Sequence, residues 1–231
     1  MPEPLAGHCM AEISATKFAI AGGFSNSIDD YISTLYIFDQ DTSEWTTRPW
    51  MAMSYGPRYD HSCMVLRSND EKYILSAGGW NNSAMPETEL FQVSEDRWMP
   101  VKRKIGVDAD GNNKYEPSFS KGVRSNKLAI INHKPFMAGG IECDGYVFQR
   151  LIMHTYVIGV QLIILTCFLC RGISERQDCK RINKVFRFKF TNEVTDGSYI
   201  GGHWIEHTAK LSKPKSSFDL LNVPTTFGRC T

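Results

Sequence analysis

The chain has 231 residues, with 26 basic and 25 acidic side chains and a formal net charge of +1. This balance argues against a nucleic-acid-binding protein, which usually carries a basic surplus, and a hydrophobic content of 42% argues against disorder. Seven cysteines are an odd number, and too few for a disulfide scaffold of this length. The composition therefore predicts a globular protein without indicating its chemistry.

The N-terminal residues MPEPLAGH lack the basic region and apolar run that mark a signal peptide. We therefore expect a cytoplasmic protein, with a membrane location as the alternative. One glycosylation sequon, Asn81-Asn82-Ser83, is present. Such triplets are common by chance and carry meaning only in a secreted protein.

An internal repeat begins near the N-terminus. Four landmarks recur 53 residues apart, namely Pro4 and Pro57, His8 and His61, Phe38 and Phe91, and Trp45 and Trp98. An apolar strand that ends in a glycine pair occurs three times, at residues 17–24, 72–80 and 134–142. We expect unit 1 at residues 4–56, unit 2 at 57–116, unit 3 at 117–213, and the start of an unfinished fourth unit at 214–231.

Each unit is predicted to contain four short strands. In unit 2 these lie at residues 62–66, 72–77, 89–93 and around 97–98, and turn residues separate them. Four strands in about 50 residues are typical of a propeller blade. The sequence outside one apolar run has no helical periodicity, so an all-β fold is expected.

The recurrence of glycine and of tryptophan at the repeated positions has a structural explanation in each case. Glycine inside a strand costs about 0.5–1 kcal/mol relative to alanine. Three glycine pairs therefore predict backbone crowding and positive φ where each second strand ends. Trp45 and Trp98 are each expected to pack against a neighbouring blade.

These residues resemble the kelch motif of β-propellers, in which a strand ends in Gly-Gly and is followed by an aromatic strand and then a tryptophan. Glu89 replaces Tyr36, and Gln92 replaces Asp39, in the second copy. The resemblance implies a propeller fragment of three four-stranded blades plus part of a fourth. The residues that carry the repeat are Gly22, Gly23, Phe38, Trp45, Gly78, Gly79, Phe91, Trp98, Gly139, Gly140, Phe188 and Trp204.

Unit 3 contains an excess of about 35 residues, at 146–180, between its second and third strands. Within it, residues 151–170 read LIMHTYVIGVQLIILTCFLC, without a formal charge. A helix of 20 residues spans about 30 Å, which matches a bilayer core. Three interpretations are open: a segment extraneous to the fold, an inserted helix on the propeller rim, or a membrane span that precludes the propeller.

Three short motifs suggest chemistry that their context does not support. His203-Trp204-Ile205-Glu206-His207 matches an inverted zinc-peptidase signature, but Trp204 belongs to the repeat. The Cys167–Cys170 pair lies inside the apolar run, and the acidic turn at residues 108–112 has its glycine too early for a calcium loop. We expect no catalytic residue, metal site or cofactor, and no enzymatic activity.

The resemblance to kelch propellers implies binding of a partner protein through loops at one end of the propeller. The expected loops are residues 25–31, 56–60 and 80–86. The candidate contact residues are Tyr31, Arg58, Tyr59, Trp80 and Asn81, because most are of the types favoured at interaction hot spots. The alternatives are a single-pass membrane protein anchored by residues 151–170, and a galactose oxidase-like copper enzyme.

Overall fold

The computed structural model describes residues 1–68, 71–131, 134–144, 178–182, 184–195 and 199–210. Within these ranges the chain is almost entirely β-structure, with one short 3₁₀ helix, η1 (Pro49–Met51). The all-β prediction is therefore confirmed. The predicted membrane span at residues 151–170, and the body of the predicted insert, lie outside the described residues. Among the residues described, no helix has the length and apolar character to cross a bilayer.

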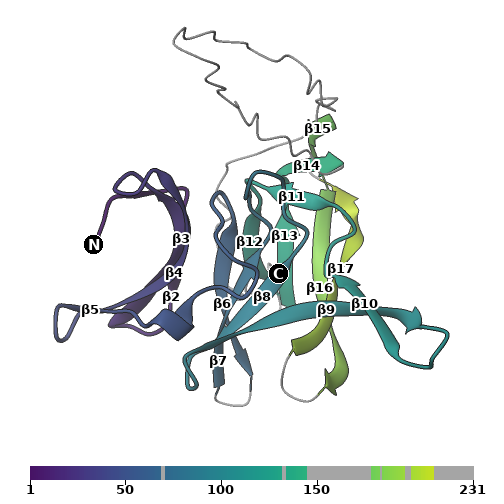
Figure 1. The fold of residues 1–231 in the computed structure, drawn as a ribbon, viewed down its shortest axis with the longest axis horizontal. Helices are drawn as coiled ribbons and strands as arrows, with labels where there is room; N and C mark the ends of the chain where they lie inside the picture. The colour runs from purple at the N-terminus through teal and green to yellow at the C-terminus, as the bar shows by residue number, and fades with distance from the viewer. Residues whose placement is uncertain (69–70, 132–133, 145–177, 183, 196–198, 211–231) are drawn as a thin grey trace, which may run out of the picture.

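Most of the strands fall into three groups of antiparallel neighbours, and group 1 stands apart at the left of Figure 1. Group 1 comprises β2 (Cys9–Glu12), β3 (Lys17–Ser25), β4 (Asp30–Asp39) and β5 (Glu44–Thr46), with the short β1 (Leu5–Ala6) paired to β3. Group 2 comprises β6 (Ser62–Ser68), β7 (Glu71–Ala77), β8 (Thr88–Gln92) and β9 (Arg97–Val107). Group 3 comprises β12 (Lys127–Ile131), β13 (Lys134–Ala138), β16 (Lys184–Thr195) and β17 (Tyr199–Lys210).

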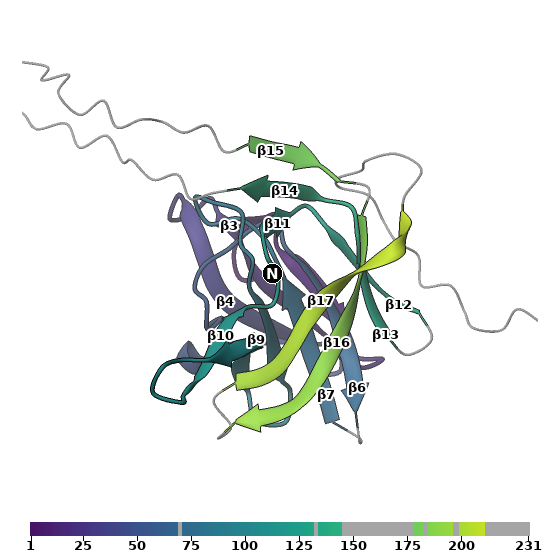
Figure 2. The same ribbon diagram turned by 90° about the vertical axis from the view of Figure 1, so that its right-hand side faces the viewer.

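Groups 2 and 3 belong to one sheet, because β17 pairs in parallel with β9 through Ile200 and Gly201. Its end strands, β6 and β12, lie against each other, so this sheet is curled and nearly closed. Figure 2 shows β16 and β17 crossing in front of the other strands. The long β9 continues past group 2 and forms a projecting hairpin with β10 (Asn113–Pro117).

A small third sheet contains β11 (Gly122–Arg124), β14 (Ile141–Asp144) and β15 (Asp178–Arg181). β15 includes residues 178–180, which the repeat pattern places at the end of the insert. Cys179 lies opposite Cys143 in this sheet, and Lys180 lies opposite Glu142. The last residues of the predicted excess are therefore part of the β-structure.

The phenylalanine and tryptophan of each repeat lie directly opposite each other in the third and fourth strands of their group. The pairs are Phe38 with Trp45, Phe91 with Trp98, and Phe188 with Trp204. Their ring centroids are 5.0, 5.3 and 5.0 Å apart, respectively. Such cross-strand aromatic pairs stabilise a sheet beyond the burial of their surface. Unit 3 thus has the same internal register as units 1 and 2.

Two hydrophobic cores lie between the groups. The first joins groups 1 and 2 and contains small residues of group 1, such as Ala19 and Ala21, against Phe91 and Trp98 of group 2. The second joins groups 2 and 3, where Phe188 and Trp204 contact the other face of group 2. Each aromatic pair of groups 2 and 3 therefore faces the preceding group.

The glycine pairs lie where adjacent groups come closest. Gly22 and Gly78 both have positive φ, at +60° and +68°. A Cβ on Gly22 would lie 2.6 Å from the carbonyl oxygen of Arg58, and one on Gly78 would lie 2.2 Å from that of Val123. The neighbouring group therefore fits only against glycine at these positions.

Candidate functional site

Three backbone segments that precede the first strand of each group adopt the same conformation. Gly7, Asp60 and Ser125 have φ values of +61°, +59° and +54°. The amide of Asp60 donates to the carbonyl oxygen of Gly7 at 2.7 Å, and the amide of Ser125 donates to that of Asp60 at 2.8 Å. The side chains of Ser125 and Asp60 are also hydrogen-bonded. These bonds fix the residues on either side, including Tyr59 and Arg124, across all three groups.

Tyr59 is the centre of a row of aromatic side chains at this end of the groups. Phe24 and Tyr31 lie opposite each other on β3 and β4, with ring centroids 5.7 Å apart. Tyr31 stacks on Tyr59 with a centroid distance of 5.0 Å and an interplanar angle of 3°. Tyr59 and Trp80 exchange two backbone hydrogen bonds, of 3.0 and 2.8 Å.

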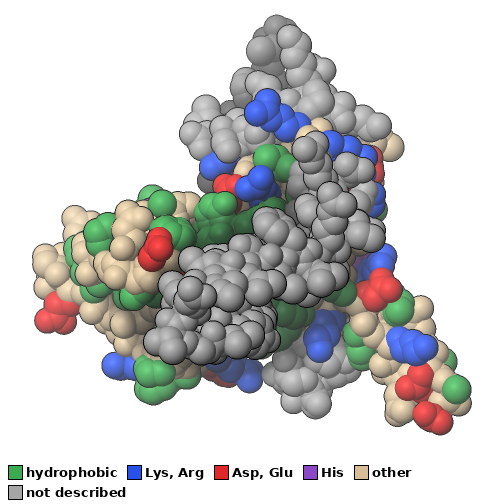
Figure 3. Space-filling model, turned by 45° about the horizontal axis from the view of Figure 1, so that its top comes forward, with side chains coloured by type: hydrophobic (Ala, Val, Ile, Leu, Met, Phe, Trp, Pro, Cys, Tyr) green, Lys and Arg blue, Asp and Glu red, His purple; other side chains and the backbone are tan. Residues whose placement is uncertain are grey.

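Arg124 closes the row at its far end. Its guanidinium carbon lies 4.5 Å from the centroid of the Trp80 ring, within the range of a cation–π interaction. The same guanidinium interacts with the hydroxyl of Tyr59. We define the aromatic row as Phe24, Tyr31, Tyr59, Trp80 and Arg124, all of which are partly exposed. Figure 3 brings this end of the molecule forward and shows hydrophobic side chains on the group 1 side.

The aromatic row has charged residues of opposite sign at its two ends. Partial burial raises the pKa of Tyr59, and the positive charge of Arg124 opposes that shift. Tyr59 is therefore an uncharged hydroxyl at neutral pH. Exposed Asp29 and Asp30 directly precede Tyr31, and the carboxylate of Asp30 accepts a hydrogen bond from the Tyr31 amide at 2.7 Å. The row thus offers aromatic surface between an acidic end and a basic end.

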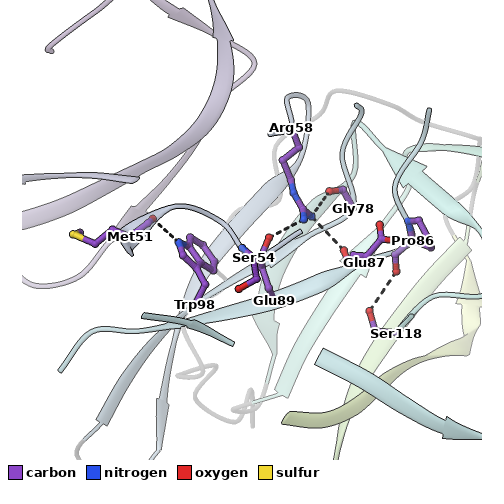
Figure 4. Close-up of polar contacts among 9 residues, drawn as sticks. All are labelled: Met51, Ser54, Arg58, Gly78, Pro86, Glu87, Glu89, Trp98 and Ser118. Carbon is purple, nitrogen blue, oxygen red and sulfur yellow. Dashed lines mark hydrogen bonds and ion pairs between the residues drawn. The ribbon is translucent and has the colours of Figure 1, made fainter. Parts of the chain in front are cut away.

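Arg58, which the sequence predicted as a contact residue, points into the molecule. Its side chain is fully buried, and its Nη2 lies 2.7 Å from Oε1 of the equally buried Glu89. Its Nη1 donates to the carbonyl oxygen of Gly78 at 3.0 Å, and Glu89 Oε2 accepts from the Ser54 amide at 2.7 Å (Figure 4). Burial raises the pKa of the Glu89 carboxyl, while the charge of Arg58 opposes that shift. Arg58 therefore supports the site from within.

The other predicted contact residues are placed at the surface. Tyr31, Tyr59 and Trp80 lie together in the aromatic row, whereas Asn81 follows Trp80 in the loop between β7 and β8. The sequence did not indicate Arg124, because it lies in β11, outside the repeated landmarks. Phe24 was also missed as a site residue, although it directly follows the first glycine pair.

The zinc-peptidase-like motif noted in the sequence lies in β-structure. No group of three or more His, Cys, Asp or Glu side chains in this part of the chain could hold a metal ion. His203 and His207 of the zinc-peptidase-like motif lie on strand β17 rather than on a helix.

Comparisons with known proteins place the chain in no family. No family model matches it, and no curated protein matches it. A solved structure titled "Structure of YjhT" is similar to 61% of the chain, with 14% sequence identity and a TM-score of 0.43. The chain corresponds to 36% of that protein's length.

Proposed function

We propose that the protein binds a partner protein through the aromatic row, and that groups 1–3 are consecutive kelch-type propeller blades that hold the row in place. The observation that carries the proposal is the stack of Tyr31 on Tyr59, beside Trp80 and Arg124. Tyrosine, tryptophan and arginine are the residue types enriched at interaction hot spots. Here they come from separate segments and converge on one end of the fold.

The blade assignment is supported by what repeats between the groups. The register of phenylalanine opposite tryptophan occurs in all three, and the glycine pairs contact the following group in the same way twice. A rigid set of sheets allows loop side chains to be presented without a large ordering cost on binding. Partner binding therefore accounts for partly exposed aromatic side chains that are already held in a fixed arrangement.

The experiment is a comparison of partner capture by the full chain and two variants. Tyr31→Ala removes the outer ring of the stack, and Trp50→Ala is the control, because Trp50 is 63% exposed and lies outside the row. We expect a saturable partner whose affinity falls about tenfold or more with Tyr31→Ala, since truncating a hot spot costs about 2 kcal/mol or more. Affinity with Trp50→Ala should stay unchanged.

A photo-crosslinking residue at position 31 should also join the chain to that same partner, whereas one at position 50 should not. Thermal unfolding of each variant checks that the fold is intact. Equal loss of binding in both variants, or full binding by a folded Tyr31→Ala variant, would exclude the row as the binding surface.

A further inference from the structure

Cys9 and Cys63 form a disulfide that joins group 1 to group 2. Cys9 lies on β2 and Cys63 on β6, with their Cα atoms 5.6 Å apart. Cys143 of the small third sheet is disulfide-bonded as well. Structural disulfides persist in secretory and extracellular compartments, whereas cytosolic thiols are kept reduced. The pairing therefore points to maturation in an oxidising compartment, rather than to the cytoplasmic location expected from the sequence.

In the secretory pathway, the sequon Asn81-Asn82-Ser83 is a candidate acceptor for an N-linked glycan. It lies in the loop between β7 and β8, where the Asn81 amide donates to the Ser83 carbonyl oxygen at 2.9 Å and Asn82 has a φ of +59°. The middle residue is not proline, as the sequon requires. Asn81 is partly exposed and Asn82 is exposed. The loop is thus a surface turn of the kind on which N-linked glycans are found.

The Asn81 side chain has the right atom free for the modification. Its Oδ1 accepts a hydrogen bond from Asn82 Nδ2 at 3.3 Å. Its own Nδ2 donates no hydrogen bond to the described part of the chain and is not a buried atom there. A sugar on Nδ2 would therefore displace no internal contact of the described fold.

We propose that Asn81 carries an N-linked glycan, attached in the secretory pathway in which the Cys9–Cys63 disulfide forms. A bond forms between Asn81 Nδ2 and the anomeric carbon of an oligosaccharide donor linked to a polyprenyl pyrophosphate. The bond from that carbon to the pyrophosphate oxygen breaks, the polyprenyl pyrophosphate leaves, and the amide loses one proton. Ser83 is buried in the folded chain, so transfer precedes closure of this loop.

The glycan would begin at the Trp80 end of the aromatic row. Tyr31 lies toward the opposite end, where it also contacts Phe24, and Tyr59 lies between Tyr31 and Trp80. A partner could therefore use the stacked tyrosines with the glycan at the edge of its contact. Occupancy of Asn81 is measured without any partner, so it can fail or succeed independently of the proposed function.

The test has two parts, both on the full chain. First, the protein is purified from its natural source, and the peptide that contains Asn81 is analysed by mass spectrometry before and after peptide N-glycosidase treatment. We expect glycan loss with conversion of Asn81 to aspartate, and no labelling of Cys9 or Cys63 by a thiol reagent before reduction. An unmodified Asn81 peptide, or free thiols at both cysteines, would overturn the proposal.

Second, the chain is produced behind a cleavable secretion signal, with variants at each position of the sequon. Asn81→Gln and Ser83→Ala should lose the glycosidase-sensitive mass, whereas Asn82→Gln and Ser83→Thr should keep it. The glycosylated protein should melt within a few degrees of its enzymatically deglycosylated form. Secretion of wild type without a glycan, or a glycosylated form that unfolds, would show that the fold does not accept a sugar at Asn81.

Discussion

Arg58 and Glu89 form an ion pair in which neither side chain is exposed to solvent, with 2.7 Å between Nη2 and Oε1. Arg58 lies in the segment that leads into β6, and Glu89 lies on β8. Glu89 also accepts from the Ser54 amide, so the pair ties the segment between groups 1 and 2 to the second sheet (Figure 4). In the first repeat, Tyr36 occupies the position of Glu89 and donates to Glu3 at 2.5 Å.

Breaking this buried pair from one side should be costly. Glu89→Gln keeps an acceptor for the Ser54 amide but leaves the Arg58 charge uncompensated, and we expect a loss of about 3–5 kcal/mol in the free energy of unfolding. The control is Lys17→Met, which breaks a partly exposed pair with Asp39 at 2.9 Å and should cost less than about 1 kcal/mol. Urea unfolding followed by circular dichroism measures both. Similar losses in the two variants would contradict the structural role of Arg58.

His61 should make stability dependent on pH. Burial, with the nearby charges of Arg58 and His8, lowers its pKa from 6.5 to about 3. Because the unfolded state then binds the proton more readily, stability present above pH 6.5 is lost as the pH falls toward 3, by up to about 1.4 kcal/mol per pH unit.

The third repeat provides the matched variant for this test. Asn126 occupies the position of His61 in the third repeat, and its side chain donates to the carbonyl oxygen of Ala77 at 3.3 Å. His61 faces the equivalent carbonyl oxygen, that of Ala21. His61→Asn should therefore flatten the difference in unfolding free energy between about pH 6.5 and pH 5. Unfolding curves of both proteins across this range give the measurement. Parallel pH profiles would show that His61 is not the titrating group.

Trp98 and Trp45 occupy equivalent positions in different surroundings. Trp98 is buried, and its Nε1 donates to the Met51 carbonyl oxygen at 2.9 Å. Trp45 is partly exposed and contacts Phe18 and Phe38 of its own group. We expect Trp98→Phe to destabilise by about 1–3 kcal/mol, and Trp45→Phe by less than about 1 kcal/mol. A comparison of their melting temperatures decides the order, and a reversed order would refute the assignment of the first core.

The crowding at the glycine pairs can be tested by alanine substitutions at two glycines that both have a positive φ. Gly78 has a φ of +68° and no space for a Cβ, whereas Gly56 has a φ of +82° and nothing within 4 Å of the point that a Cβ would occupy. Gly56→Ala should cost about 1–2 kcal/mol for the left-handed backbone alone. Gly78→Ala adds overpacking of about 1–3 kcal/mol. Equal losses, measured by urea unfolding, would mean that the groups do not crowd Gly78.

The repeat pattern predicted the positions that are fixed by local geometry. Phe188 and Trp204 were assigned by analogy with the two earlier units, and they lie opposite each other as the earlier pairs do. The pairing of these two residues was predictable because hydrophobic spacing and turn residues determine register within one antiparallel group. Residues 151–170 and the start of the expected fourth unit lie outside the described residues, so those predictions stay predictions.

The sequence did not predict which of two consecutive side chains faces the interior and which faces the surface. Arg58 and Tyr59 are neighbours of similar hot-spot type, yet Arg58 is buried in an ion pair and Tyr59 stacks at the surface. The segment that carries them is an irregular link between groups, where no periodicity indicates which side faces inward. Arg124 could not be predicted either, since its contact with Trp80 joins residues 44 positions apart.

The cysteines illustrate the division between sequence and tertiary structure. The sequence places Cys9 and Cys63 in the first strands of units 1 and 2. Cys9 aligns with Ser62, so Cys63 is one position further along its strand, and neighbouring strand residues point to opposite faces. Only the packing of group 1 on group 2 brings these two opposite faces together and permits the disulfide. Composition and the repeat therefore determined an all-β chain of repeated strand groups, because those features depend on local spacing. The tertiary structure decided the buried ion pair, the disulfide and the aromatic row, because each joins segments that meet only when the groups pack.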